Sequence, residues 1–259
     1  MNNRKTALVT GASGGLGLEF ARLLAADGYR VVLVARNEAA LKEAVSEMQN
    51  LYGAESSYYA TDLSQPEKVE SLLQQLQSDN IGIDCLINNA GFGDAGYFLD
   101  KPYGLHQEMM QLNMVTLTRL THALAQKMKE RGHGYILNLA STAAFQPAPA
   151  FAVYAATKAY VMSFSEALRY ELRKSGVSVT VSCPGPTETA FHDRAATRTS
   201  KIMKMGMMKP EVVAEQAYRA MKQGKRRVVH GWLNQLLTLS GTITPRSILI
   251  KATHDLMKP

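Results

Sequence analysis

Tyr154 and Lys158 could together move a proton. Residues four apart lie on the same side of a helix, so the two side chains would point in one direction. A lysine ammonium stabilises a phenolate and lowers the pKa of a tyrosine toward working pH, which suits proton transfer. The spacing alone selects no pair, because it occurs four times, as Tyr97–Lys101, Tyr154–Lys158, Tyr170–Lys174 and Tyr218–Lys222.

The neighbouring strand separates one pair from the others. Ser141 stands at the carboxyl end of an apolar run, and Tyr154 and Lys158 open the helix that follows. In open parallel sheets, ligands bind beyond the carboxyl ends of the strands. The other three pairs follow no such strand end and are expected to be surface residues. We therefore expect a hydroxyl donor, Ser141, to lie beside the pair formed by Tyr154 and Lys158.

A glycine-rich turn from Thr10 to Gly17 lies between the first apolar strand and the first helix. Glycines let the backbone approach a pyrophosphate, and a helix N-terminus adds free N–H groups and a positive dipole. In this position the turn is typical of dinucleotide binding. A glycine-rich turn without a ligand is the alternative. The predicted contacts are Gly11, Ser13, Gly14, Gly15, Leu16 and Gly17.

Arg36 follows the second strand, nineteen residues beyond Gly17. An NAD site usually has an acid near this position to hold the ribose 2′-hydroxyl, whereas a basic residue suits a 2′-phosphate. Arg36 therefore favours NADP(H). We assign Glu38, two residues further on, to the first turn of the next helix, where an acid is favourable.

Strand and helix patterns alternate along the chain. The predicted strands are Lys5–Thr10, Arg30–Ala35, Ser56–Ala60, Ile83–Asn88, Gly134–Ala140, Val177–Cys183 and Arg227–His230. The predicted helices are Leu16–Ala26, Glu38–Tyr52, Pro66–Gln77, His106–Arg131, Ala152–Ser175 and Pro210–Gln223. Apolar strands separated by helices indicate a parallel sheet covered on both faces. We predict an α/β fold with a single domain over residues 1–259, a Rossmann-type doubly wound sheet of about seven strands.

The last quarter of the chain follows a different pattern. Pro184–Lys209 has no clear period, and a loop of this length without its own structure is usually functional. We predict a substrate lid over residues 184–225. An apolar, partly helical tail is expected over residues 231–259. The uncharged stretch Val228–Thr244 contains too many polar residues to span a bilayer.

Composition limits the class of protein. The chain has 259 residues, of which 46% are hydrophobic and 20% charged, and it needs no disulfide or metal to form a core. Cys85 and Cys183 lie in apolar runs and are expected to be buried, reduced thiols. His122, His133 and His192 have no metal-ligand spacing, so we expect no metal. No targeting segment is recognised, and a soluble cytoplasmic protein is expected.

The positive charge is concentrated in residues 194–227. This basic segment holds ten Lys or Arg and two acids, a net charge of +8, so the rest of the chain sums to −1 and the whole chain to +7. It could attract an anionic carrier, phosphates or an anionic membrane surface, or it could be a solvated helix face and loop. Because it lacks interleaved aromatic residues, we do not expect nucleic-acid binding.

With these residues in place, the chain resembles the short-chain dehydrogenase/reductase family from Lys5 to His230. The matching residues are Thr10–Gly17, Asp62-Leu63, Asn88-Asn89-Ala90-Gly91, Asn113, Ser141, Tyr154-x-x-x-Lys158, and Pro184-Gly185 with Thr187 and Thr189. Each motif is modest alone, but the set in this order is highly specific. Leu16 stands where isoleucine is commoner in the family.

The resemblance implies a role for each matching residue. Tyr154 would be the general acid in reduction, Lys158 would hold the nicotinamide ribose, and Ser141 would polarise the substrate carbonyl. Asn113 would support a water that returns protons through Lys158, although it could instead bridge backbone groups. Asp62 would lie by adenine, or it could cap the next helix. The other implied cofactor contacts are Leu63, Asn89, Ala90, Gly91, Pro184, Gly185, Thr187 and Thr189.

The substrate is indicated less directly. The segment after Pro184 usually shapes the pocket in this family, and here it holds Phe191, Met203, Met205, Met207 and Met208. Flexible thioethers suit a long apolar ligand. The tail also resembles long-chain 3-ketoacyl reductases and hydroxysteroid dehydrogenases, so we expect an NADPH-dependent reductase of an apolar ketone, such as a 3-oxoacyl compound. Alternatives are methionines at an oligomer interface and a cofactor-binding regulator without turnover. The family also implies a homo-dimer or tetramer.

Overall fold

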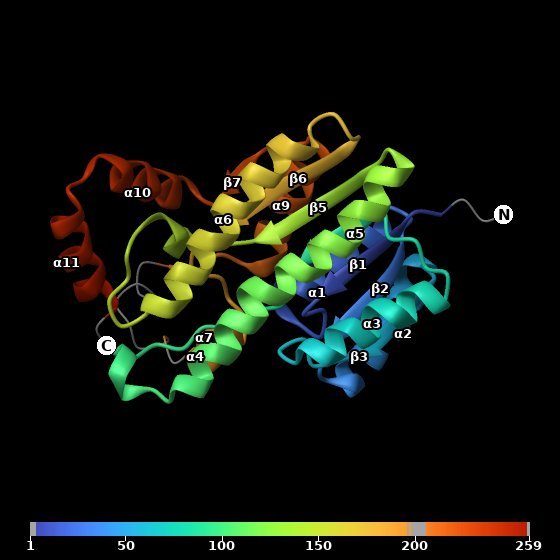
Figure 1. The fold of residues 1–259 in the computed structure, drawn as a ribbon, viewed down its shortest axis with the longest axis horizontal. Helices are drawn as coiled ribbons and strands as arrows, with labels where there is room; N and C mark the ends of the chain where they lie inside the picture. Colours follow the sequence, from blue (N-terminus) through green and yellow to red (C-terminus); the bar gives the residue numbers. More distant parts are fainter. Residues whose placement is uncertain (1–3, 196, 198–205, 258–259) are drawn as a thin grey trace.

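A computed structural model describes residues 4–195, 197 and 206–257 (Figure 1). Seven strands form one parallel sheet in the order β3-β2-β1-β4-β5-β6-β7. The strands are β1 (Thr6–Thr10), β2 (Arg30–Ala35), β3 (Ser56–Ala60), β4 (Cys85–Asn88), β5 (Gly134–Leu139), β6 (Val177–Cys183) and β7 (Arg227–Val229). The predicted doubly wound parallel sheet is therefore confirmed.

The central strands are apolar on both sides because both faces of the sheet are covered. All five residues of β1 and all four of β4 are buried. These two strands are neighbours although two strands and three helices separate them in the chain. The direction of winding reverses between them, and such a switch point opens a crevice at the carboxyl ends of the strands.

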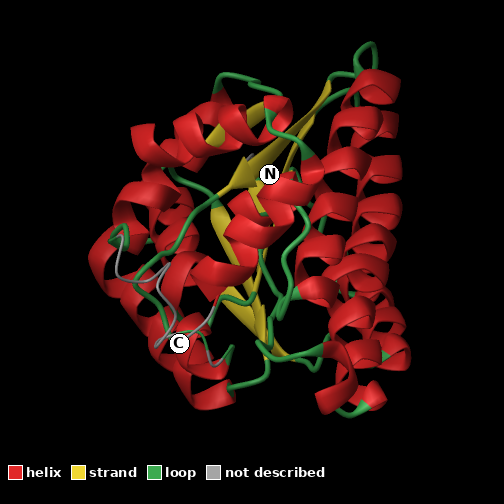
Figure 2. Cartoon of the chain, turned by 90° about the vertical axis from the view of Figure 1, so that its left-hand side faces the viewer, coloured by secondary structure: helices red, strands yellow, loops and turns green. Residues whose placement is uncertain are grey.

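Helices cover both faces of the sheet, which Figure 2 shows between two helical layers. On one face, α1 (Gly15–Ala26), α2 (Glu38–Tyr52) and α9 (Pro210–Lys222) bury residues such as Phe20, Met48 and Met221. On the other face lie α3 (Pro66–Ser78), α5 (Leu117–Arg131) and α6 (Ala152–Leu172), with residues such as Leu72 and Leu124 in the core. These side chains recur at helical spacing, which is why the sequence predicted the helices.

The long helix expected over His106–Arg131 consists of three parts. They are α4 (Tyr103–Met110), a π-helical segment η2 (Gln111–Thr116) and α5. A π-helical turn holds an extra residue and is frequent at functional sites. The short 3₁₀ turns η1 (Phe98–Asp100) and η3 (Thr142–Phe145) follow β4 and β5.

The chain beyond β6 contributes both to the core and to the edge of the molecule. The short helix α7 (Phe191–Arg194) follows β6, and a bridge joins Thr187 to Met208. Helix α9 belongs to the core layer, so the predicted lid range 184–225 includes a core helix. The function of the preceding residues as a lid stays a prediction. The expected apolar tail forms α10 (Trp232–Ile243) and α11 (Arg246–Met257).

Two kinds of feature are absent from the part of the chain that the structure describes. None of its helices has the combination of length and apolar character needed to cross a membrane. None of its His, Cys, Asp and Glu residues form a group of three or more that could hold a metal ion. Cys85 and Cys183 are both buried and free, as expected, and burial raises the pKa of each thiol to about 12.

Candidate active site

One pocket of about 670 Å³ lies at the carboxyl ends of the strands. It runs from Arg36, after β2, past the glycine-rich turn to Tyr154 on α6. Because its lining runs from the end of β2 to α6, the pocket suits an extended ligand rather than a compact one. Every predicted site residue lines it except Gly17 and Asn113, which lie behind its wall.

The glycine-rich turn is built for close backbone approach. Gly11 has a φ of +67°, a conformation that other residues rarely adopt, and its N–H donates to the carbonyl of Val34 at 2.8 Å. A Cβ on Gly17 would overlap the carbonyl of Gly11, so Gly17 lets helix α1 pack onto the turn. Gly17 therefore shapes the site without lining it.

The N-terminus of α1 is open to the pocket. Gly14 precedes the helix and supplies no side-chain cap. The N–H groups of the first helical turn have no partner within the helix. Gly14, Gly15 and Leu16 line the pocket at this point, so these groups and the helix dipole can hold a phosphate.

The end of the pocket beyond β2 carries a cation. Arg36 lines it and is exposed, and Glu38 instead pairs with Lys42 at 3.0 Å in the first turn of α2. Partial burial alone would raise the pKa of Asp62. Hydrogen bonds from Ser64 and the charge of Arg36 nevertheless hold that pKa below its usual value. Arg36 thus lies on the wall at this end of the pocket, and its contact with a 2′-phosphate stays a prediction.

Asp62 serves the local backbone as well as the pocket. Its carboxylate accepts hydrogen bonds from the backbone N–H and the hydroxyl of Ser64, at 3.0 and 2.8 Å. Helix α3 begins after Gln65 without a side-chain cap, so Asp62 forms a turn before the helix and does not have the capping role that the sequence left open. The next residue, Leu63, is buried and lines the pocket, and its carbonyl accepts from Thr116 at 2.7 Å.

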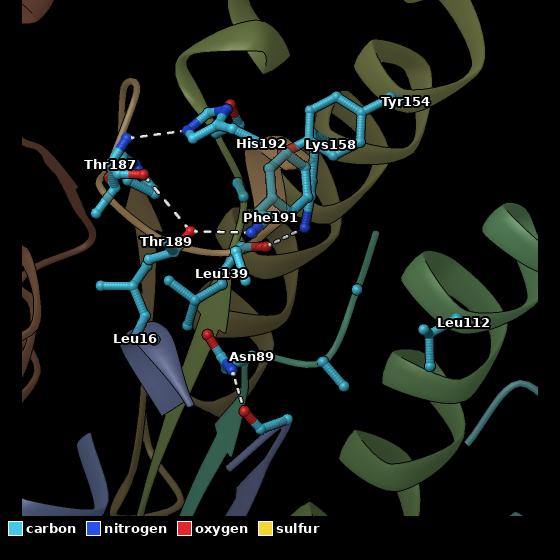
Figure 3. A pocket seen from close by; sticks show the side chains of 18 of the residues that line it. Leu16, Asn89, Leu112, Leu139, Tyr154, Lys158, Thr187, Thr189, Phe191 and His192 are labelled. Atoms are coloured by element: carbon cyan, nitrogen blue, oxygen red, sulfur yellow. Dashed lines mark hydrogen bonds between the residues drawn. The ribbon is translucent and has the colours of Figure 1, made fainter. Parts of the chain in front are cut away.

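Asn89 joins the segment after β4 to the glycine-rich turn. Its side-chain amide donates to the carbonyls of Thr10 and Gly11, at 2.9 and 3.3 Å (Figure 3). The Thr10 hydroxyl in turn accepts from the N–H groups of Asn89 and Ala90. Two loops that are far apart in the sequence are thereby held as one wall, with Ala90 and Gly91 facing the pocket.

Ser141, Tyr154 and Lys158 meet at the other end of the pocket. The ammonium of Lys158 donates to the carbonyl of Leu139 at 2.8 Å and lies 5.7 Å from the centre of the Tyr154 ring (Figure 3). The hydroxyl oxygen of Ser141 accepts from the N–H of Ala143 at 3.1 Å, which orients the side chain at the end of β5. The expected catalytic group is thus assembled.

Burial controls the protonation of this group. It raises the pKa of Tyr154 to about 12, and a hydrogen bond with Ser141 acts in the opposite direction. It also lowers the pKa of Lys158 to about 8. The sequence led us to expect a lowered tyrosine pKa. Burial outweighs the lysine here, because the ammonium is directed at the Leu139 carbonyl.

Asn113 lies behind the pocket, in the π-helical segment η2. Its side chain accepts from the N–H of Phe92 at 3.1 Å and donates to the carbonyl of Phe92 at 2.9 Å. It also donates to the Thr157 hydroxyl at 3.1 Å. Asn113 therefore bridges backbone groups, the alternative that the sequence left open, and it holds the wall at Gly91 against α6.

The residues after β6 close the third side of the pocket. The Thr187 N–H donates to the ring of His192 at 3.3 Å, and the Thr189 hydroxyl accepts from the N–H of Phe191 at 3.3 Å (Figure 3). Pro184 and Gly185 line the pocket as predicted. The ring of Phe191 lies 5.5 Å from that of Tyr154, and this places an apolar surface beside Tyr154.

The structure describes two of the four methionines that were expected to line the pocket, Met207 and Met208. Met207 and Met208 do not line the pocket, because the backbone of Met208 pairs with Pro186 and Glu188 in the bridge to Thr187. This part of the expectation is wrong. Met203 and Met205 lie outside the described residues.

Several lining residues carried no recognisable signal. Phe151 packs on Tyr154 with ring centres 4.3 Å apart, and Gln146 and Ala148 lie beside it. Thr253 reaches the pocket from α11, almost at the end of the chain. A threonine in an amphipathic tail has no distinguishing pattern, so only the tertiary structure could place it there.

The basic segment 194–227 is partly neutralised. Four of its described cations form ion pairs, namely Arg219 with Glu215 at 2.6 Å, Lys222 with Asp27 at 2.7 Å, and Arg226 and Arg227 with Glu166 at 3.7 and 3.3 Å. These ion pairs support the alternative that the described part of the basic segment is a solvated helix face. Arg198, Lys201 and Lys204 lie outside the described residues.

A switch-point pocket with a phosphate-binding turn at one end and a serine, a tyrosine and a lysine at the other defines a nicotinamide-dependent oxidoreductase. The model of the short chain dehydrogenase family matches residues 5–200. The chain belongs to this family. It is an oxidoreductase that binds a nicotinamide dinucleotide and acts on a small molecule.

Named relatives agree with this assignment. The chain is 38% identical over 177 residues to a very-long-chain 3-oxoacyl-CoA reductase of Laccaria bicolor, covering 67% of this chain and 52% of that protein. It is 33% identical over 252 residues to the ketoacyl reductase HetN of a Nostoc species, covering 94% and 86%. It thus spans about half the length of the first relative and most of the second.

A solved structure shows the same architecture. A short-chain dehydrogenase from Sphingobium yanoikuyae in complex with NADPH superposes with a TM-score of 0.83 and 29% sequence identity. The match covers 92% of this chain and 93% of that one. The similarity therefore extends beyond the family-model match into the C-terminal part of the chain.

Proposed function

We propose that the protein is an NADPH-dependent reductase that converts an apolar ketone, such as a 3-oxoacyl compound, to an alcohol. The observation that carries the proposal is the single pocket that joins the glycine-rich turn and Arg36 to Ser141, Tyr154 and Lys158. A hydride donor bound along this pocket would end beside the hydroxyls of Ser141 and Tyr154.

Each catalytic residue has a role that its surroundings support. Tyr154, kept protonated by burial, donates the proton to the carbonyl oxygen. Ser141 hydrogen-bonds that oxygen and orients it. When bound, the reduced nicotinamide supplies the hydride. Lys158 holds the nicotinamide ribose, and Asn113 keeps the neighbouring wall in place.

The preference for NADPH rests on Arg36. A guanidinium matches a phosphate in charge and geometry and hydrogen-bonds it in pairs. Arg36 faces the end of the pocket where the adenosine ribose would lie, and Glu38 is engaged with Lys42. The complex of the Sphingobium relative with NADPH agrees with this choice.

The apolar substrate rests on the walls near Tyr154. Phe151, Phe191, Ala143 and Ala148 line this end of the pocket. An apolar wall with a few placed polar groups favours a largely apolar ligand. The names of the Laccaria and Nostoc relatives point to 3-oxoacyl compounds. A homo-dimer or tetramer, a cytoplasmic location and an anionic carrier or membrane surface bound through residues 194–227 stay predictions.

The proposal is tested by following NADPH consumption with short and long 3-oxoacyl thioesters, esters and a steroid ketone. We expect a rate that rises with the length of the apolar chain. Tyr154→Phe should lower kcat by a factor on the order of 10² to 10⁴ and leave NADPH binding within about twofold. Tyr170→Phe, on the exposed face of α6, is the matched control and should behave as wild type.

Two outcomes would contradict the proposal. Unchanged turnover in Tyr154→Phe would remove this tyrosine from the chemistry. Tight NADPH binding with no turnover of any ketone would discard the acyl substrate and favour a regulatory or interaction protein that binds the cofactor.

A further inference from the structure

Helix α10 turns its apolar side toward solvent. Trp232, Leu236, Leu239 and Ile243 stand at helical spacing and form one row, which we call the α10 stripe. Their exposed fractions are 77%, 56%, 66% and 83%. Scattered exposed apolar residues are ordinary on a protein surface, but a continuous row along one helix marks an interaction site.

The opposite side of α10 is the polar one, and it faces the protein. The Asn234 side chain donates to the carbonyl of His230 at 2.8 Å. Thr238 is buried, and Gly241 approaches Gln146, which lines the pocket. This arrangement is the reverse of an ordinary surface helix, in which the apolar side is buried. The stripe is therefore not a misplaced part of the core.

Exposed apolar residues continue from the stripe onto neighbouring elements. Ile248 and Ile250 on α11 are exposed, and α10 and α11 lie together at one edge of the molecule (Figure 1). Further along α11, the ring of His254 contacts the hydroxyl of Tyr97 at 2.9 Å. Beside Tyr97, Leu99 is 88% exposed. Further apolar residues are therefore exposed on α11 and in the segment that follows β4.

Charge distinguishes between the surfaces that could cover the stripe. Helix α10 has no charged residue, and the first charges beyond it are Arg246 and Lys251, both exposed. Neither forms an ion pair within the described part of the chain. Asp255 is the only acid in residues 231–257. These three residues give this surface a local net charge of +1, which an anionic surface attracts and the same surface of a second copy repels.

We propose that the α10 stripe docks onto the surface of an anionic lipid bilayer. With 12 residues the helix is about 18 Å long, too short to cross a hydrocarbon core of about 30 Å, so it lies in the plane of the interface. Tryptophan is favoured at this depth, and nearby cations add attraction to acidic headgroups. The inference concerns a surface and does not depend on which ketone is reduced.

The chain carries its own reporter of this contact, since Trp232 is its single tryptophan. Full-length protein saturated with NADP⁺ is mixed with vesicles of phosphatidylcholine, with or without phosphatidylglycerol. With phosphatidylglycerol we expect co-flotation, a blue shift of the tryptophan emission and quenching by brominated lipid. Leu236→Gln combined with Ile243→Gln should lower the bound fraction at least about tenfold, because it removes two anchors of the stripe.

Leu51→Gln is the matched control. Leu51 is 66% exposed at the end of α2, so the same substitution should leave vesicle binding unchanged. Circular dichroism establishes that both variants are folded. Lack of flotation overturns the proposal, as does flotation with unchanged tryptophan emission, which would indicate binding through other basic residues. A lipid-independent blue shift that rises with protein concentration, together with a dimer lost in Leu236→Gln, would assign the stripe to a second copy and equally overturn it.

Discussion

At the scale of single residues, burial decides the state of the catalytic pair. Tyr154 is protonated at neutral pH, because its pKa is about 12, and this is the form that can donate a proton to a carbonyl. Lys158 has a pKa of about 8 and so changes charge close to working pH. Its hydrogen bond to the Leu139 carbonyl fixes its position in both forms. Tyr154 is therefore in the acid form that the proposed reduction requires.

The buried lysine predicts a pH dependence of stability. Burial lowers the pKa of Lys158 from 10.5 to about 8, so below pH 8 the folded state carries the full penalty of a buried ammonium. Between pH 8 and 10.5 the unfolded state binds the proton and the folded state does not, so stability rises with pH. Relative to Lys158→Met, the free energy of unfolding of the wild type should rise by up to about 3 kcal/mol across this window.

Urea denaturation at several pH values measures this difference. Tyr154→Phe is the control, because the pKa of Tyr154 is raised from 10 to about 12 and its contribution changes only above pH 10. The difference in the free energy of unfolding between the wild type and this control should not change with pH up to pH 10. If the difference in the free energy of unfolding between the wild type and Lys158→Met is also independent of pH, the lysine is hydrated rather than buried.

Arg36 predicts a change in cofactor preference. Arg36→Asp should raise the Kd of NADPH on the order of 10- to 100-fold, because a charge-assisted contact to the 2′-phosphate is replaced by repulsion. The Kd of NADH should change by less than about threefold. Fluorescence titration with both cofactors measures the ratio. Lys42→Asp removes a nearby cation that does not line the pocket, and it should alter neither constant strongly. Equal losses for both cofactors would remove Arg36 from phosphate recognition.

At the scale of elements, the site depends on segments that join one strand end to another. Asn89 ties the segment after β4 to the glycine-rich turn, and Asn113 ties the same segment to η2 and α6. The π-helical turn explains how a residue in the middle of a long helix can reach the Phe92 backbone. The walls of the pocket are therefore held by side-chain amides rather than by strand pairing.

A substitution of Asn113 tests whether side-chain amides hold the walls of the pocket. Asn113→Ala leaves a buried N–H and a buried carbonyl of Phe92 without their partner, and each such loss costs about 1 to 3 kcal/mol. We expect the free energy of unfolding to fall by about 2 to 4 kcal/mol, measured by urea denaturation. Gln111→Ala, in the same segment but only half-buried, should change it by less than about 1 kcal/mol. Similar losses for both variants would argue against a special role for the Phe92 contacts.

At the scale of the whole molecule, the pocket is completed by the end of the chain. Thr253 on α11 lines it, and the neighbouring His254 contacts Tyr97 across the molecule. Residues separated by more than 150 positions in the chain are therefore in contact. Through Thr253, helix α11 forms part of the wall of the pocket.

Thr253→Phe should narrow the substrate end of the pocket. We expect kcat/KM for bulky or long ketones to fall at least about tenfold, with a smaller loss for short ketones, because the added ring occupies space that the larger ligand needs. The Kd of NADPH should stay within about twofold. Ala252→Phe, on the exposed side of the same helix, is the matched control. An equal loss for short and long ketones would show that Thr253 does not border the ligand.

The sequence by itself predicted the order of strands and helices, the glycine-rich turn, Arg36 and the Ser141–Tyr154–Lys158 group. Each of these depends on local pattern, on residues close together in the chain or on a motif at a strand end. For the same reason, the predicted boundaries of most strands and helices agree closely with those in the structure. The π-helical segment η2 was not predicted, because an extra residue in a helix leaves no break in the hydrophobic spacing.

Only the tertiary structure decided what depends on distant contacts. It revealed Thr253 in the pocket, Met208 outside it, the bridging role of Asn113 and the raised pKa of Tyr154. It also turned the apolar side of α10 outward, although periodicity alone would place that side in the core. Burial and orientation are properties of the packed chain, because they depend on which surfaces meet, and no local spacing contains that information.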